Sequence, residues 1–96
     1  MQRSIHYENL ETKIYSGSDV LITFQPKDKI ELRRGIEEGK HVVSLVAPWG
    51  NIYKLGTYDD EITAQKEFKK YDNYIQKGYS INITSLHTIQ MIPPSK

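Results

Sequence analysis

The strongest periodic pattern of apolar residues lies between residues 60 and 77. Its apolar positions follow the i, i+4, i+7, i+11 spacing of one helix face, and they are Ala64, Phe68, Tyr71 and Ile75. Asp59 and Asp60 are residue types preferred at a helix N-cap, and Gly78 stands where a glycine commonly follows a helix. The pattern predicts an amphipathic helix over about residues 60–77 that packs its apolar face on a sheet.

Two runs rich in β-branched and aromatic residues precede this helix, at residues 41–47 and 52–58. The quartet Pro48-Trp49-Gly50-Asn51 between them favours a turn, which predicts a β-hairpin. A loop with an even number of residues would place Val42, Ser44, Val46, Tyr53 and Leu55 on one face and Val43, Leu45, Ala47 and Ile52 on the other. Because one helix covers only one face, we expect the chain's own terminal segments or a second molecule to cover the other.

Further strands are predicted where apolar and polar residues alternate over short runs. The clearest are residues 19–24 and 79–83, and weaker patterns occupy residues 5–7, 13–15 and 86–92. These segments supply additional strands for the sheet that the hairpin begins.

Residues 28–38 fit two patterns. Asp28 and Glu31 resemble a capping box, which favours a helix, whereas Ile30, Leu32 and Arg34 alternate as in a strand. We favour a strand, because Gly35 would weaken a helix interior by roughly 1 kcal/mol.

These elements predict an α+β fold, in which an antiparallel sheet of roughly four to six strands carries one principal helix on one face. With 96 residues, the chain has room for one domain, which we expect over residues 1–92. Residues 93–96 begin with two prolines and are expected to form a flexible C-terminal tail.

Composition narrows the cellular setting. The 13 Lys and Arg residues against 12 Asp and Glu leave a net charge of +1, too balanced to attract DNA or an acidic membrane through the overall field. The chain has no cysteine, which excludes disulfides and thiolate metal sites. No apolar run is long enough for a signal peptide or a membrane span. We therefore expect a cytoplasmic protein without a membrane partner.

The sequence contains no spacing typical of a catalytic, metal or phosphate site. His6, His41 and His87 lie far apart and match no metal-binding motif. The acidic run from Asp59 to Glu61 has a simpler role, since negative charge favours a helix N-terminus. We expect a protein without enzymatic activity, cofactor or metal.

A resemblance adds a biological setting. The segment from Ile52 to Ile75 resembles small uncharacterised bacterial and phage proteins in which a strand ends in Leu-Gly-x-Tyr and leads into a capped helix. The matching residues here are Leu55, Gly56, Tyr58, Asp59 and Ala64. This resemblance implies an accessory or inhibitor protein of a phage, prophage or other mobile element.

Two other families have a similar strand-to-helix junction. Residues 48–50 and 55–59 are similar to the junction of AP2-type DNA-binding domains, which implies a sheet that reads DNA and a helix that supports it. The same step also resembles the SPOR repeat, which implies peptidoglycan binding.

For a protein partner of unknown identity, the expected interface contains Trp49, Tyr53 and Arg34. Tryptophan, tyrosine and arginine are enriched among interface anchors, and Trp49 stands at the predicted hairpin tip. Its side chain either projects into solvent there or folds back over Tyr53 or the helix. A homo-oligomer that covers its own second sheet face is an alternative.

The other function considered is DNA or RNA binding. The densest basic run contains Lys27, Lys29, Arg33 and Arg34, and seven tyrosines are available to stack on bases. Such a run also occurs as a solvated strand whose charges prevent unwanted pairing.

Overall fold

The chain folds into two sheets of four strands and one helix. The computed structural model describes residues 3–8, 10–85 and 88–94. Sheet A has the order β1 (Arg3–Tyr7), β4 (Ile30–Glu37), β5 (Lys40–Val46) and β6 (Ile52–Tyr58), and all its pairs are antiparallel. Sheet B has the order β3 (Asp19–Phe24), β2 (Thr12–Ser16), β7 (Ser80–Ser85) and β8 (Thr88–Ile92), with β2 and β7 parallel. The predicted α+β class is confirmed, and its strands divide between two sheets.

The helix α1 (Glu61–Gln76) has the ends that the sequence predicted. The Asp60 carboxylate accepts a hydrogen bond from the Thr63 backbone N–H at 2.8 Å, which satisfies a free donor of the first turn. Gly78 has a φ of +83°, a left-handed conformation that glycine adopts without strain. The four apolar residues that defined the helix pattern are all buried.

Residues 28–38 form a turn and strand β4, as favoured from the sequence. The Asp28 carboxylate accepts a hydrogen bond from the Gln25 backbone N–H at 2.9 Å, so it stabilises a turn instead of capping a helix. Ile30, Leu32 and Arg34 alternate on the buried side of the strand.

The register of the β5–β6 hairpin corrects the predicted faces. Val46 pairs with Ile52, which leaves the five residues 47–51 in the loop, an odd number. A bulge at Leu55 shifts the register again. As a result Leu55 and Tyr53 pack with the main apolar core, whereas Ile52 is exposed beside Val46.

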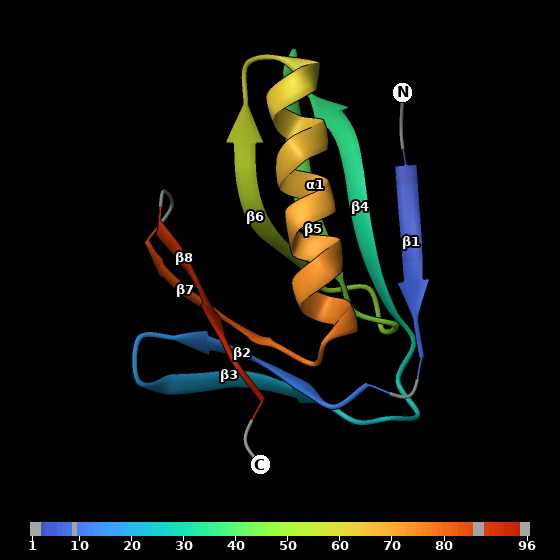
Figure 1. The fold of residues 1–96 in the computed structure, drawn as a ribbon, viewed down its shortest axis with the longest axis vertical. Helices are drawn as coiled ribbons and strands as arrows, with labels where there is room; N and C mark the ends of the chain where they lie inside the picture. The colour runs from blue at the N-terminus through green and yellow to red at the C-terminus, as the bar shows by residue number, and fades with distance from the viewer. Residues whose placement is uncertain (1–2, 9, 86–87, 95–96) are drawn as a thin grey trace.

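One apolar core joins the helix to both sheets. It combines Leu45 of sheet A, Phe68 of α1 and Ile81 of sheet B in one cluster. Figure 1 shows α1 lying along sheet A, with the strands of sheet B crossing beneath the C-terminal end of the helix. Sheet B therefore closes the end of the core.

On the face of sheet A opposite α1, the central strand is covered by side chains of its neighbouring strands. Its centre carries Val42 and Ser44 of β5, which are buried. The Lys54 Nζ atom on β6 lies 2.9 Å from the Glu37 carboxylate on β4, so this ion pair crosses over β5. Side chains of the flanking strands thus cover the centre of this face, while Ile52 at its edge is exposed. The C-terminal strands contribute to the core on the other side of the sheet.

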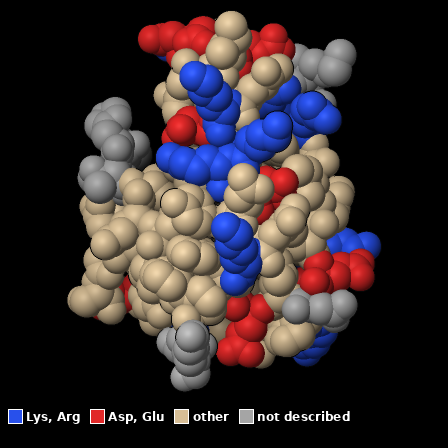
Figure 2. Space-filling model, viewed as in Figure 1, with Lys and Arg blue, Asp and Glu red and all other residues tan. Residues whose placement is uncertain are grey.

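Charge is distributed unevenly between the two sheets. Figure 2 shows Lys and Arg side chains gathered over α1, whereas the surface over sheet B is almost entirely uncharged. The strands of sheet B contain only Lys13 and Asp19 as charged residues, and residues 79–94 contain none.

Candidate functional site

Two grooves flank α1, one at each edge of sheet A. The helix packs on β4, β5 and β6 and leaves space beside each edge strand. The aromatic groove, beside β6, is lined by Lys54, Leu55, Gly56, Thr57, Tyr58, Glu67, Lys70, Tyr71, Ile83 and Ile89. The basic groove, beside β1, is lined by Arg3, Ile5, Arg34, Gln65, Phe68, Lys69 and Asp72.

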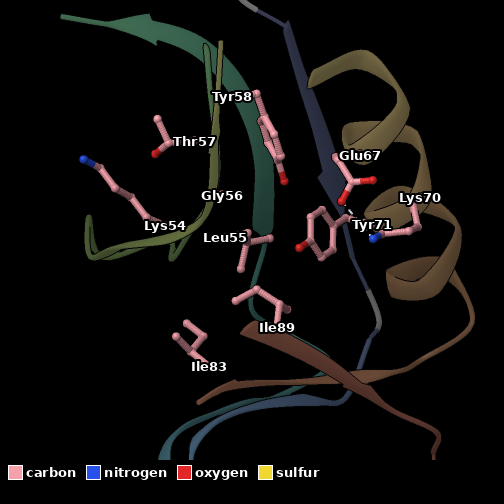
Figure 3. Close-up of a pocket in the computed structure, with 10 residues that line it drawn as sticks. All are labelled: Lys54, Leu55, Gly56, Thr57, Tyr58, Glu67, Lys70, Tyr71, Ile83 and Ile89. Atoms are coloured by element: carbon pink, nitrogen blue, oxygen red, sulfur yellow. Dashed lines mark hydrogen bonds and ion pairs between the residues drawn. The ribbon is translucent and has the colours of Figure 1, made fainter. Parts of the chain in front are cut away.

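The aromatic groove has a volume of about 530 Å³ and is formed by three separate parts of the chain. Strand β6 forms one wall, α1 forms the second, and Ile83 and Ile89 of sheet B form the floor (Figure 3). The hydroxyl groups of Tyr58 and Tyr71 point into the space between β6 and α1. The groove therefore has an apolar floor and polar groups on its walls.

Gly56 makes room for Tyr58 within this groove. A Cβ atom at position 56 would lie 2.6 Å from the Tyr58 Cζ atom, far closer than two carbon atoms approach. The tyrosine ring thus lies across the backbone of its own strand, over a position where only a glycine leaves space. This gives a physical reason for the Leu-Gly-x-Tyr step that the sequence displayed.

The ionisable groups of the aromatic groove favour neutral tyrosines. Burial, followed by the nearby Glu67 carboxylate, raises the pKa of Tyr58 above its usual range. Burial and the neighbouring Tyr58 and Glu67 side chains raise the pKa of Tyr71. Lys70 pairs with Glu67 at 2.8 Å, and its Nζ atom lies 5.3 Å from the centre of the Tyr71 ring.

The basic groove has a volume of about 270 Å³ and a different chemistry. Arg3, Arg34 and Lys69 contribute three positive side chains, against the single carboxylate of Asp72. That carboxylate accepts a hydrogen bond from the Tyr7 hydroxyl at 2.6 Å. Burial, with the hydrogen bond to Asp72, raises the pKa of Tyr7 far above its usual range.

Trp49 and Tyr53, expected at a partner interface, both have structural contacts. The Trp49 ring stacks on Phe24 with 5.7 Å between the ring centres, and half of its surface remains exposed. It therefore folds back, but over Phe24 and not over Tyr53 or the helix. Tyr53 is partly buried against the core. Replacing Trp49 would uncover Phe24, so loss of binding in such a variant would not separate recognition from stability.

The four residues of the basic run do not form one surface. Arg34 is 3% exposed and lies on the helix side of sheet A, where it lines the basic groove. Arg33 lies on the opposite face and makes two hydrogen bonds to Glu31, at 2.9 and 3.1 Å. Lys29 pairs with Glu8 at 3.2 Å, and Lys27 is exposed in the turn before β4.

Several residues of the grooves were not singled out as site residues from the sequence. The Leu-Gly-x-Tyr step contained the signal for Tyr58, because a glycine beside a tyrosine in a strand indicates close packing. Ile83 and Ile89 gave no such signal, since only the contact between sheet B and the end of the helix brings them to β6.

The described residues contain neither a metal-binding cluster nor a helix that could cross a membrane. Within residues 3–8, 10–85 and 88–94, no three His, Asp or Glu side chains are close enough together to hold a metal ion. His87, one of the histidines considered from the sequence, lies outside the described residues. The helix found in the described part of the chain is not long and apolar enough to cross a membrane.

Comparison with known proteins adds no relative. No protein-family model matches this chain, and no curated protein or solved structure matches it either.

Proposed function

We propose that this protein is a non-enzymatic binding protein that holds an extended segment of a partner protein in the aromatic groove. The observation that carries the proposal is the position of this groove along the open edge of sheet A. Five consecutive residues, Lys54–Tyr58, line the groove, and β6 is the last strand of the sheet. The outward N–H and C=O groups of an edge strand are able to pair with an added strand.

The groove also indicates which side chains the bound segment presents. Alternate side chains of a strand point to the same side, so every second residue of the segment would face the groove. The floor of Ile83 and Ile89 favours an apolar side chain there. Lys54 and Lys70 at the rim are already paired with Glu37 and Glu67, so charge on the segment is not required.

The resemblance of residues 52–75 to small bacterial and phage proteins extends this proposal. It supports a role as an accessory or inhibitor protein of a phage, prophage or other mobile element, which we propose acts in the cytoplasm. In that setting the bound segment belongs to a host protein or to another protein of the same element.

Site-specific cross-linking tests the docking proposal, because the chain contains no natural cysteine. Thr57→Cys places a maleimide photo-cross-linker beside the aromatic groove, and Ser18→Cys places it in the exposed turn between β2 and β3 as a matched control. Both proteins are irradiated in lysate of the source cells, with and without nuclease treatment. Ile89→Glu is then combined with Thr57→Cys to place a charge in the apolar floor, and circular dichroism verifies that this protein is folded.

Support requires one protein that is cross-linked through Thr57→Cys, not through Ser18→Cys, and that is lost with Ile89→Glu. Mass spectrometry should locate its cross-link in an extended apolar segment. Equal labelling from both positions, or labelling that Ile89→Glu leaves unchanged, would contradict the proposal. A partner lost on nuclease treatment would favour the nucleic-acid alternative, and cross-linking of the protein to itself would favour the homo-oligomer.

A further inference from the structure

We propose that the basic groove is a binding site for a carboxylate group and that Arg34 is the residue that holds it. This groove lies between β1 and α1, on the other side of the helix from the aromatic groove. The proposal rests on different residues from the docking function and does not depend on it.

The first observation is a buried arginine whose Nε atom has no hydrogen-bond partner among the described residues. Arg34 is 3% exposed, and its Nε atom has no hydrogen-bond partner among the residues that the structure describes. None of the ion pairs found between described residues includes Arg34. Burying a charge without a partner is strongly unfavourable, so buried arginines are normally paired. The Nε–H group of Arg34 is therefore a donor that a ligand can satisfy.

The second observation is the concentration of positive charge around it. Arg3 is directly opposite Arg34 in the antiparallel pairing of β1 with β4, an arrangement in which like charges repel. Lys69 of α1 lines the same groove. The groove's carboxylate, Asp72, uses its Oδ1 atom to accept hydrogen bonds from Tyr7 at 2.6 Å and Gln76 at 2.9 Å. An anion bound among the three cations would relieve their repulsion.

The shape and charge of the groove favour a carboxylate over a phosphate. A guanidinium donates two parallel hydrogen bonds to a carboxylate, which fits the planar ends of both groups. Ile5 and Phe68 line the groove and provide apolar contact for a short hydrocarbon chain that carries the anion. Asp72 adds a negative charge to the same space, which opposes a doubly charged phosphate more than a singly charged carboxylate. The expected ligand is therefore a carboxylate on a slender apolar group.

Arg33 provides a matched control within the same strand. It is adjacent to Arg34, carries the same charge and points to the opposite face of sheet A, where Glu31 already satisfies it with two hydrogen bonds. Hydrogen bonding to Glu31 raises the pKa of Arg33, as expected for a guanidinium with a partner. Arg33→Gln changes the net charge as Arg34→Gln does, but leaves the basic groove intact.

Nuclear magnetic resonance of the arginine Nε–H groups tests the assignment directly. The ¹⁵N-labelled full chain is titrated with sodium butyrate, which carries a carboxylate on a short apolar chain, at constant pH and ionic strength. Sodium chloride and sodium phosphate are titrated in parallel. Wild-type protein, Arg34→Gln and Arg33→Gln are compared, with backbone spectra to verify the fold.

Butyrate is expected to give a saturable shift of the Arg34 Nε–H signal in the wild-type protein. Arg33→Gln should bind butyrate as well as the wild type, whereas Arg34→Gln should bind it about tenfold more weakly or worse. The absence of a saturable shift at Arg34 would overturn the proposal, as would equal binding by both variants. A response to phosphate that exceeds the response to butyrate would overturn the choice of a carboxylate. If Arg34→Gln does not fold, the wild-type signal and Arg33→Gln still decide the result.

Discussion

The two grooves beside α1 share one helix and one sheet, yet they differ in chemistry. The aromatic groove is closed by Ile83 and Ile89 from sheet B, and its lysines Lys54 and Lys70 have acidic partners. The basic groove has no contribution from sheet B among its described lining residues, and the Nε atom of Arg34 has no hydrogen-bond partner among the described residues.

This difference shows how position in a sheet changes the role of a charged side chain. On the face of sheet A opposite α1, long charged side chains of different strands form ion pairs, as Lys54 and Glu37 do. Arg34 instead lies under the helix, where Arg3 is its direct cross-strand neighbour. A charged side chain costs little free energy on the exposed face of sheet A, where water and an ion-pair partner stabilise it. On the helix side, the same charge is buried and is stabilised only if a partner or a ligand pairs with it.

The largest expected effect comes from breaking the aromatic groove at Gly56. A valine there would displace the Tyr58 ring, whose Cζ atom lies 2.6 Å from the new Cβ position, and we expect a loss of about 2–3 kcal/mol in the free energy of unfolding. Urea denaturation measures the loss. Thr57→Val, at the exposed neighbouring position, is the control and should change stability little.

A second variant shows whether Tyr58 causes that loss. In a Tyr58→Ala background, Gly56→Val should cost much less, because the ring that it displaces is absent. Additive losses in the double variant would contradict the proposed contact. Butyrate binding in the basic groove should be unaffected throughout.

A smaller loss of stability is expected when a tyrosine hydroxyl is removed beside either groove, and the size of the loss should differ between the two grooves. Tyr7→Phe removes a hydrogen bond to the Asp72 carboxylate and should lower the free energy of unfolding by about 1.5–2 kcal/mol. Tyr71→Phe removes a hydroxyl that faces the neutral Tyr58, and we expect about 1 kcal/mol or less. Urea denaturation of both variants decides the order, and a larger loss for Tyr71→Phe would reverse the contrast.

The Tyr7→Phe and Tyr71→Phe variants also test the carboxylate proposal through their affinity for butyrate. Without the Tyr7 hydroxyl, the Asp72 carboxylate loses a donor and becomes a better partner for the neighbouring cations. Tyr7→Phe should therefore weaken butyrate binding, and Tyr71→Phe should leave it unchanged. Equal butyrate affinities in the two variants would show that Asp72 does not compete with the ligand.

A further expected effect, which requires no substitution, is a loss of stability at alkaline pH. The folded state raises the pKa of Tyr7, Tyr58 and Tyr71, whereas unfolded tyrosines have a pKa of about 10. The unfolded chain therefore releases these protons first, so stability is retained below about pH 10 and falls as the pH rises above it. Urea midpoints between about pH 8 and about pH 11 measure the loss, which should be smaller in Tyr7→Phe. A midpoint that does not change over this range would contradict the burial of these hydroxyl groups.

Much of the local structure followed from the sequence, for reasons visible in particular residues. Asp60 and Gly78 mark the ends of α1, and the alternation of Ile30 with Leu32 outweighed the capping-box pattern of Asp28. The hairpin was predicted, but its faces were assigned wrongly. The odd number of loop residues and the bulge at Leu55 each shift the pairing of β5 with β6 by one residue. A shift of one residue moves every following side chain of the strand to the opposite face.

The candidate sites were harder to predict. Trp49 and Tyr53 have the residue types of interface anchors, but residue type does not show what a side chain packs against. Arg34 belonged to a basic run in the sequence, and strand alternation placed it on the face opposite Arg33. Its significance comes from the burial of its Nε atom without a described hydrogen-bond partner, which depends on every neighbouring element.

The sequence by itself determined the helix, the strands and the α+β class, because helix caps, turn residues and apolar periodicity act between residues that are close along the chain. Only the tertiary structure decided that the strands form two sheets, that Ile83 closes a groove against β6, and that Arg3 lies opposite Arg34. These pairings join residues far apart in the sequence, and the pattern of each segment is compatible with several partners. The chemistry of both grooves therefore depends on long-range packing, which selects one set of neighbours from those that the local patterns permit.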